Sequence, residues 1–268
     1  MLKTKLLVIA LGAAFALPAM AEDAPVTKHK EEVHAAAEAA SPITYNVGLV
    51  TDYIYRGITQ TTHKPAVQGG LDYAHSSGLY AGAWASNVSW IKDSGAIATG
   101  DSKIELDTYF GFKNGITADL SYDVGYVRYN YLGGYTPAAG FNNADTAEVY
   151  GAATFKFVTL KYSYSLLDGF LTVPGTKGTN YIDLSASYPV ADTGVTVGAH
   201  YGKQTFVGTT LSAGNALSYD DYKLSASKDF SGYVVGLAYT STNATAAWTY
   251  NGEQWGKSVV ALSATHSF

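Results

Sequence analysis

The sequence predicts an all-β fold, a transmembrane antiparallel up-and-down β-barrel of about 12 strands. Three observations support this prediction. The chain opens with an export signal, its residues then alternate between apolar and polar over many runs, and the connections between the runs alternate between short and long. Together they predict short periplasmic turns and longer extracellular loops.

The first residues predict export. Lys3 and Lys5 are followed by an apolar stretch over 6–17, and Ala19-Met20-Ala21 forms a small-residue cleavage site. We therefore expect residues 1–21 to be a signal peptide that is cleaved after Ala21. An apolar stretch of about 12 residues is too short for a transmembrane helix, which needs roughly 20.

The segment 22–42 has helical propensity but no apolar stripe, which predicts a periplasmic N-terminal tether. A short docking helix or a plug is the alternative. From residue 43 onward the period of the sequence changes to two, so we expect the outer-membrane β-barrel to occupy residues 43–268.

Composition excludes several kinds of chemistry. The chain has no cysteine, so thiol chemistry and Cys-ligated metals are excluded. His29 and His34 have no further ligand nearby, and we expect neither a metal site nor a cofactor. The excess of acidic over basic residues argues against nucleic acid as a partner. The 22 tyrosines and 28 glycines suit a tightly packed sheet with aromatic girdles.

The alternating runs predict the individual strands. They lie at 43–56, 65–75, 79–90, 103–113, 116–131, 146–157, 158–168, 179–190, 195–206, 219–230, 232–242 and 256–268. Runs of about 10–12 residues match a tilted membrane span better than the strands of a soluble sandwich or lipocalin-like barrel, which are typically shorter.

The connections predict which end of each strand faces which side of the membrane. Short turns are expected at 76–78, 114–115, near 157–158, at 191–194 and at 231–232. Longer polar loops are expected at 57–64, 91–102, 132–145, 169–178, 207–218 and 243–255. Both termini then lie on the periplasmic side, which requires an even number of strands.

The polar members of the alternation predict the lining of the barrel. A charge facing lipid at mid-membrane costs about 2–4 kcal/mol, so charged residues within the strands should face the lumen. The lumen-lining candidates are Asp52, Arg56, Asp72, Glu105, Asp107, Asp119, Asp123, Glu148, Lys156, Lys161, Asp183, Asp221 and Lys223.

Arg56 is expected at the extracellular mouth. It is four residues from Asp52, or about 13 Å along a strand, so the two side chains cannot pair with each other. An ion pair with an acid of a neighbouring strand is one interpretation of Arg56, and a substrate-orienting charge is the other.

The chain end predicts how the barrel is assembled. Phe268 is an aromatic terminus on an alternating strand, and such an end resembles the signal read by the outer-membrane insertion machinery. The alternative is that Phe268 is the last lipid-facing aromatic residue of a girdle. The expected partners are therefore outer-membrane lipid, the barrel-insertion machinery and periplasmic chaperones.

The segment from Val50 to Gln60, VTDYIYRGITQ, resembles the opening strand of the proteobacterial family of conserved hypothetical proteins called Gcw_chp, also labelled TorF-family porins. The resemblance extends more loosely over residues 45–268, including Asp72-Tyr73, Gly82, Trp84 and Phe268. It implies an outer-membrane barrel and location in the cell outer membrane, and it adds an expectation of transport.

The charges of the candidate lining predict the function. Nine acids face four bases, and a narrow tube with such an excess concentrates cations. We therefore expect a channel for small solutes with mild cation preference. A closed structural or surface-interaction barrel is the alternative. A lipid-modifying enzyme is a remote one, because His200 lies mid-strand with no serine two residues away.

Overall fold

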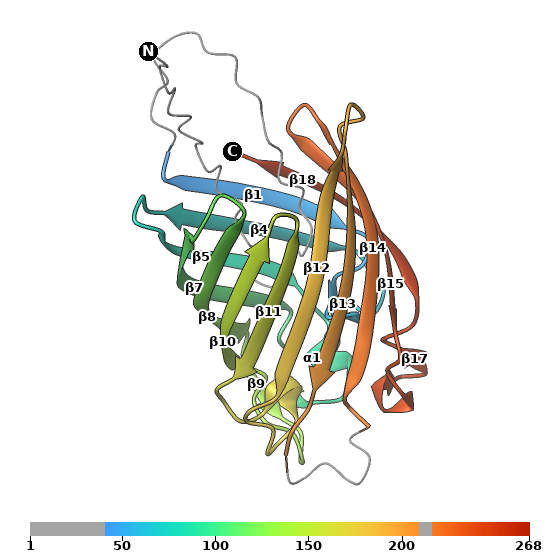
Figure 1. Ribbon diagram of the computed structural model, residues 1–268. Helices are drawn as coiled ribbons and strands as arrows, with labels where there is room; N and C mark the ends of the chain where they lie inside the picture. The colour runs from blue at the N-terminus through green and yellow to red at the C-terminus, as the bar shows by residue number, and fades with distance from the viewer. Residues whose placement is uncertain (1–40, 209–215) are drawn as a thin grey trace, which may run out of the picture.

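The computed structural model describes residues 41–208 and 216–268. Twelve strands form a closed antiparallel barrel in which each strand pairs with the next along the chain and the last pairs with the first (Figure 1). These strands are β1 (Ile43–Val50), β4 (Ala66–Ala74), β5 (Leu79–Asn87), β7 (Ile104–Gly115), β8 (Leu120–Leu132), β10 (Thr146–Phe155), β11 (Val158–Ser165), β12 (Asn180–Val190), β13 (Val195–Thr205), β14 (Tyr219–Phe230), β15 (Tyr233–Thr242) and β18 (Val259–Ser267). The predicted fold class and strand number are confirmed.

The two segments that precede the barrel fall almost entirely outside the described residues. The expected signal peptide, 1–21, lies wholly outside them. Of the expected tether, 22–42, only Ser41 and Pro42 are described.

The connections alternate in length as predicted. One end of the barrel has the short turns 75–78, 116–119, 156–157, 191–194 and 231–232. The other end has the long connections 51–65, 88–103, 133–145, 166–179, 206–218 and 243–258. Since both ends of the described chain lie with the short turns, we call that end periplasmic and the other end extracellular.

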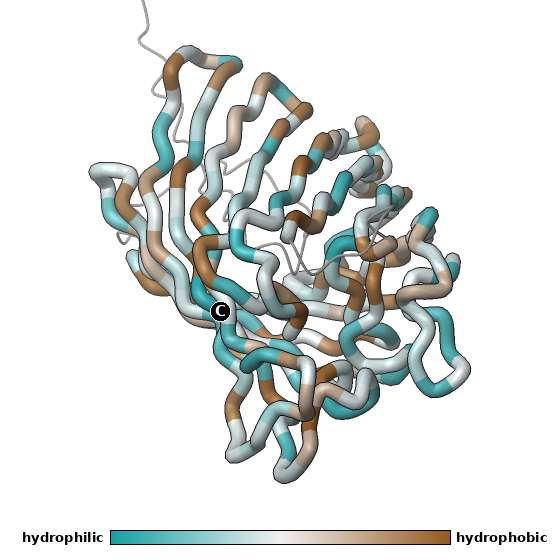
Figure 2. Tube along the Cα trace, turned by 90° about the horizontal axis from the view of Figure 1, so that it is seen from below, coloured by the Kyte–Doolittle hydropathy of each residue, from teal (hydrophilic) through white to brown (hydrophobic). Residues whose placement is uncertain are grey.

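The outer face of the barrel is apolar. Leu49, Phe110, Leu224 and Val260 are each more than half exposed, although large apolar side chains are normally buried in water-soluble domains. Figure 2 shows hydrophobic and hydrophilic residues alternating along the strands. An apolar belt of this kind is the surface that a hydrocarbon environment requires.

The long connections carry short elements of their own. These are β2 (Ile54–Tyr55), β3 (Ile58–Thr59), α1 (Trp90–Asp93), β6 (Ile97–Gly100), β9 (Tyr135–Pro137), the 3-10 turns η1 (Phe170–Thr172) and η2 (Ala246–Trp248), β16 (Thr249–Tyr250) and β17 (Glu253–Gln254). Within 41–208 and 216–268, no helix has the length and apolarity of a membrane span.

The first strand is shorter than predicted. It ends at Val50, whereas the sequence predicted strand through residue 56. Thr51 accepts a hydrogen bond from the backbone N–H of Leu262 on its side-chain oxygen, at 2.9 Å, and pairing with β18 stops there. Arg56 and Gly57 then both adopt positive φ, which turns the chain back on itself as the β2–β3 hairpin.

One turn also differs from its prediction. Asn114 and Gly115 are the last residues of β7 and pair with Tyr122 and Ser121, so the predicted Asn-Gly turn is wrong. The turn comprises residues 116–119. Its closure is aided by Thr117, whose side-chain oxygen accepts hydrogen bonds from the backbone N–H groups of residues 119 and 120.

Candidate functional site

The connection that follows β1 folds into the barrel. We call residues 51–65 the inner hairpin. Tyr53 is 1% exposed and packs edge to face against Trp84 of β5, and Tyr55 packs in the same way against Tyr129 of β8. The predicted strand 43–56 would have kept Tyr53 and Tyr55 in the barrel wall. That assignment is wrong, because the chain has left the barrel wall before it reaches them.

Arg56 holds the tip of the inner hairpin in the barrel interior. Its guanidinium binds both carboxylate oxygens of Glu148 on β10, at 3.1 and 2.7 Å, and donates to Gln204 Oε1 on β13 at 2.9 Å. It also lies over the rings of Tyr55 and Tyr181, with centroids at 4.8 and 4.3 Å. We call Arg56, Glu148 and Gln204 the arginine latch. Glu148 and Gln204 lie within two residues of the extracellular ends of their strands, so Arg56 is buried near that end and pairs with an acid of the wall.

Asp52 ties the two ends of the inner hairpin together. Its carboxylate accepts hydrogen bonds from the Thr59 and Thr61 hydroxyls at 2.6 and 3.3 Å, and it lies 2.6 Å from Nδ1 of His63. Three side chains from the returning half of the hairpin thus converge on one carboxylate of its first half. A local network of this kind stabilises the folded-in conformation.

An acidic cluster lies beside the arginine latch. Glu105 and Asp107 of β7 are 1% and 0% exposed, and Glu105 accepts a hydrogen bond from the Tyr53 hydroxyl at 2.8 Å. Both carboxylate oxygens of Asp107 are buried without a hydrogen-bond partner among the described residues. Glu105, Asp107 and Glu148 thus place three carboxyl groups in this part of the interior, beside the guanidinium of Arg56.

His200 forms the centre of a second cluster. Its Nδ1 lies 2.6 Å from a carboxylate oxygen of Asp183, and its Nε2 lies 2.8 Å from one of Asp221. The Tyr181 hydroxyl is 3.0 Å from both His200 Nε2 and Asp221. Both ring nitrogens therefore face carboxylates, and this geometry is not that of a histidine that activates a serine.

Two pairs of oppositely charged residues lie side by side on neighbouring strands of the wall. Lys161 of β11 is the register partner of Asp183 on β12, and Lys113 of β7 is the register partner of Asp123 on β8. Directly opposed residues have Cβ atoms about 4.5–5.5 Å apart. Lys113 was missed among the candidates, although it continues the two-residue period of Glu105 and Asp107.

The remaining candidates separate into two groups. Asp72 is buried on the inner face and accepts a hydrogen bond from the Tyr109 hydroxyl, while Lys223 is half-buried beside His200 in the register. Asp119 and Lys156 are exposed in periplasmic turns and do not line the lumen. Their runs were assigned as strand, but β8 begins at Leu120 and β10 ends at Phe155.

Phe268 follows β18 at the periplasmic end. It exchanges backbone hydrogen bonds with Tyr45 of β1, at 2.9 and 3.3 Å, and its exposed ring lies edge-on to His266. The structure places it at the seam where the barrel closes, and its role in insertion stays a prediction.

The side chains that line the lumen differ between the periplasmic and the extracellular ends of the barrel. Toward the periplasmic end, several inward-facing positions on β12, β14 and β18 are short and half-buried, namely Ser185, Ser187, Ser225, Ser227 and Ser263. On β5, β7 and β8 the inward-facing residues of this half include the larger Tyr80, Lys113 and Asp123. Near the extracellular end, by contrast, the inward-facing side chains are buried under the inner hairpin. The lumen is therefore filled toward the extracellular end, and toward the periplasm its lining is hydrophilic.

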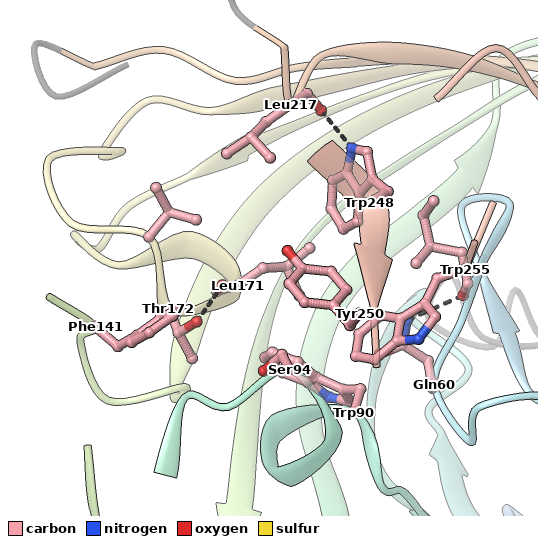
Figure 3. Close-up of a pocket in the computed structure, with 12 residues that line it drawn as sticks. Gln60, Trp90, Ser94, Phe141, Leu171, Thr172, Leu217, Trp248, Tyr250 and Trp255 are labelled. Atoms are coloured by element: carbon pink, nitrogen blue, oxygen red, sulfur yellow. Dashed lines mark hydrogen bonds between the residues drawn. The ribbon is translucent and has the colours of Figure 1, made fainter. Parts of the chain in front are cut away.

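The extracellular connections meet in an aromatic cap. Trp90, Tyr250 and Trp255 come from two different connections, and Figure 3 shows their rings around a common space. Trp248 packs edge to face against Phe206 and Tyr219, which continues the apolar packing. No local sequence pattern identifies these contacts, because they join connections that are distant along the chain.

Solved structures share the barrel fold at low sequence identity. The NanC porin aligns with a TM-score of 0.50 and 9% identity, over 84% of this chain and 98% of that one. The KdgM porin in complex with disordered oligogalacturonate aligns with a TM-score of 0.49 and 8% identity, over 84% of this chain and 98% of that one. OprD from Pseudomonas aeruginosa aligns with a TM-score of 0.40 and 14% identity, over 87% of this chain and 68% of that one. At such identities the likeness is one of fold.

No match is found among curated proteins. The family model described as a bacterial protein of unknown function, Gcw_chp, matches residues 35–268. Since this match covers the whole described barrel, the chain belongs to the Gcw_chp family.

Proposed function

We propose that this protein is an outer-membrane channel for small solutes with a mild preference for cations, and that the inner hairpin closes it in the conformation described. The observation that carries the proposal is the contrast between the two faces of the wall. The outside is an apolar belt, whereas the inside carries charged and short hydroxyl side chains. An apolar outer face and a polar inner face are the two surfaces that a membrane channel requires.

Location in the outer membrane follows from the same wall. In lipid, every backbone polar group must be paired within the protein, and a closed barrel meets this requirement. The leader predicted over residues 1–21 supplies the export that this location needs. NanC, which shares the fold, is called a porin, and the proposal assigns the same class of activity to this chain.

The cation preference rests on the acidic side chains of the inner face, which outnumber the basic ones. Arg56 is neutralised by Glu148, and Lys113 and Lys161 stand opposite Asp123 and Asp183. Other acids remain on the inner side, including Asp72, Glu105 and Asp107. Negative charge behind low-dielectric walls raises the local concentration of cations and repels anions.

The closed state rests on the arginine latch. The inner hairpin fills the extracellular half of the lumen, and Arg56 is its contact with β10 and β13. Removing one partner of a buried ion pair costs about 3–5 kcal/mol, because the other charge stays buried without compensation. Loss of Arg56 should therefore weaken the attachment of the hairpin to β10 and β13, while Tyr53 and Tyr55 still pack against the wall and the strand pairing is left unchanged.

The test is single-channel recording in planar bilayers with the Arg56→Ala variant. We expect a higher open probability or conductance than for the wild type, and a reversal potential in a potassium chloride gradient that indicates cation preference. The matched control is Arg128→Ala, whose guanidinium lies 3.6 Å from Asp145 and is 40% exposed. Heat-modifiable gel mobility verifies that each variant is folded.

Two outcomes would contradict the proposal. Absence of conductance in both the wild type and the folded Arg56→Ala variant would favour a closed structural or surface-interaction barrel. Anion selectivity would contradict the charge argument while leaving the channel in place.

A further inference from the structure

A cavity lies at the extracellular end where all six long connections converge. Each connection contributes to its lining: Ile58 and Gln60, Trp90 and Ser94, Phe141, Leu171 to Val173, Leu217, and Trp248 with Tyr250 and Trp255. The enclosed space is about 30 Å³, enough for about two waters. Its walls bound about 440 Å³ of free space when the part open to solvent is included.

The lining residues are uncharged. Their side chains are aromatic or aliphatic, with Gln60, Ser94 and Thr172 as the polar members (Figure 3). This contrasts with the interior below the cavity, where acids and bases are clustered. A site without charged groups favours an uncharged ligand, because a charged one would lose its hydration without gaining a partner.

Two hydrogen-bond donors of the lining have no partner. The indole N–H groups of Trp90 and Trp255 are buried and unpaired among the described residues. The third indole of the cavity differs, since Trp248 donates to the backbone oxygen of Leu217 at 3.1 Å. Buried donors are nearly always paired in folded proteins, so two unpaired ones in one cavity point to acceptors that arrive with a ligand.

The backbone at the cavity is strained. Leu171 and Thr172 are consecutive non-glycine residues with φ of 49° and 67°, in the left-handed region. Such positions persist only where the surroundings impose them, and they concentrate at ligand sites. This strain is independent of the unpaired donors and lies in the same wall.

We propose that this cavity binds an uncharged ring compound that carries oxygen acceptors on its edge. The aromatic side chains offer flat apolar faces to such a ring, and the indole N–H groups of Trp90 and Trp255 offer hydrogen bonds to its oxygens. Because the enclosed space is only about 30 Å³, the ring would lie mainly in the part of the cavity that is open to solvent. Neutral sugars and neutral heteroaromatic amides share this chemistry.

The test measures binding to the full-length folded protein in detergent by isothermal titration calorimetry, supported by intrinsic tryptophan fluorescence. Glucose, glucosamine and glucuronate form a series of one ring with neutral, positive and negative charge, and nicotinamide represents the heteroaromatic source. We expect saturable binding of glucose or nicotinamide in the roughly 1–10 mM range, and weaker binding of both charged sugars.

Substituted proteins distinguish the contribution of the indole N–H groups to binding from that of the aromatic faces. Trp90→Phe and Trp255→Phe keep an aromatic face but remove the N–H, and we expect each to weaken binding about two- to tenfold. Trp84→Phe is the matched control, because Trp84 faces the interior on β5, packs against Tyr53 and does not line the cavity.

Three results would overturn the inference. They are no saturable binding of either neutral probe, equal affinity for neutral and charged sugars, or equal weakening by Trp84→Phe and Trp90→Phe. Binding is measured without current, so this inference and the proposed channel activity fail separately.

Discussion

At the scale of single residues, the inner wall is built from tyrosines laid over glycines. Tyr150 of β10 lies across Gly125 of β8, its register partner, so that a Cβ on that glycine would be 2.5 Å from the tyrosine oxygen. Tyr109 crosses Gly82 in the same way. The glycines thus let large tyrosine rings lie close against the backbone of the wall.

A substitution at one of these glycines should destabilise the barrel. In Gly125→Ala the new methyl group meets Tyr150, and overpacking of this kind typically lowers the free energy of unfolding by about 1–3 kcal/mol. The measurement is urea unfolding in lipid vesicles. The control is Gly151→Ala, where the nearest atom to the added Cβ is 4.0 Å away. Equal stability of the two variants would show that Tyr150 moves aside freely.

At the scale of elements, the inner hairpin is an insertion into an otherwise regular wall. Val50 and Ala66, the residues that flank it, are register partners at the adjoining ends of β1 and β4. The two strands therefore need only a tight turn between them, and residues 51–65 are free to serve another purpose. Their burial in the lumen indicates that this purpose is to fill it.

Replacing residues 51–65 with Asn-Gly should leave a folded barrel with a wider lumen. Asn-Gly is a favoured two-residue hairpin turn, so the β1–β4 pairing is retained. We expect normal heat-modifiable mobility and a larger single-channel conductance than that of the wild type. The control replaces 191–194 with Asn-Gly between the register partners Val190 and Val195, at the periplasmic end. An unchanged conductance in the first variant would mean that the hairpin does not obstruct the lumen.

The sequence predicts the wall far better than what fills it. Strand number and the alternation of loop lengths follow from local patterns, because a membrane span has a fixed length and two distinct faces. The inner hairpin was missed because Tyr53 and Tyr55 continue the period of β1 after the chain has left the sheet. Gly57 already ended the predicted strand at residue 56, and it gives no sign that the chain leaves the wall after Val50. The partner of Arg56 is 92 residues away, and no local pattern identifies it.

At the scale of the whole molecule, the barrel separates two solvents. Leu224 is 63% exposed on the outer face of β14, and the next residue, Ser225, is half-buried on the inner face. The same alternation around all twelve strands means that one residue of displacement along a strand moves a side chain from lipid to lumen.

Cysteine labelling tests this assignment, because the natural chain has no cysteine. In liposomes with a membrane-impermeant maleimide on both sides, Ser225→Cys should react and Leu224→Cys should not. In detergent-free urea, where the chain is unfolded, both cysteines should react equally. This measurement gives the reactivity of each position without protection by the fold. Protection of both positions in liposomes would contradict a water-accessible lumen.

The seam between β1 and β18 has a consequence for how such a chain can be made. Asn46 pairs with Ser267 and Val50 with Ser263, so the first strand finds its second neighbour only when the last strand arrives. Until then two rows of backbone groups are open, and each unpaired group in hydrocarbon costs several kcal/mol, or roughly 2–7. Shortened chains that lack β18 therefore gain no partial stability from the strands they retain. Assembly in the bilayer should be all-or-none, with the rate set by delivery of the final strand.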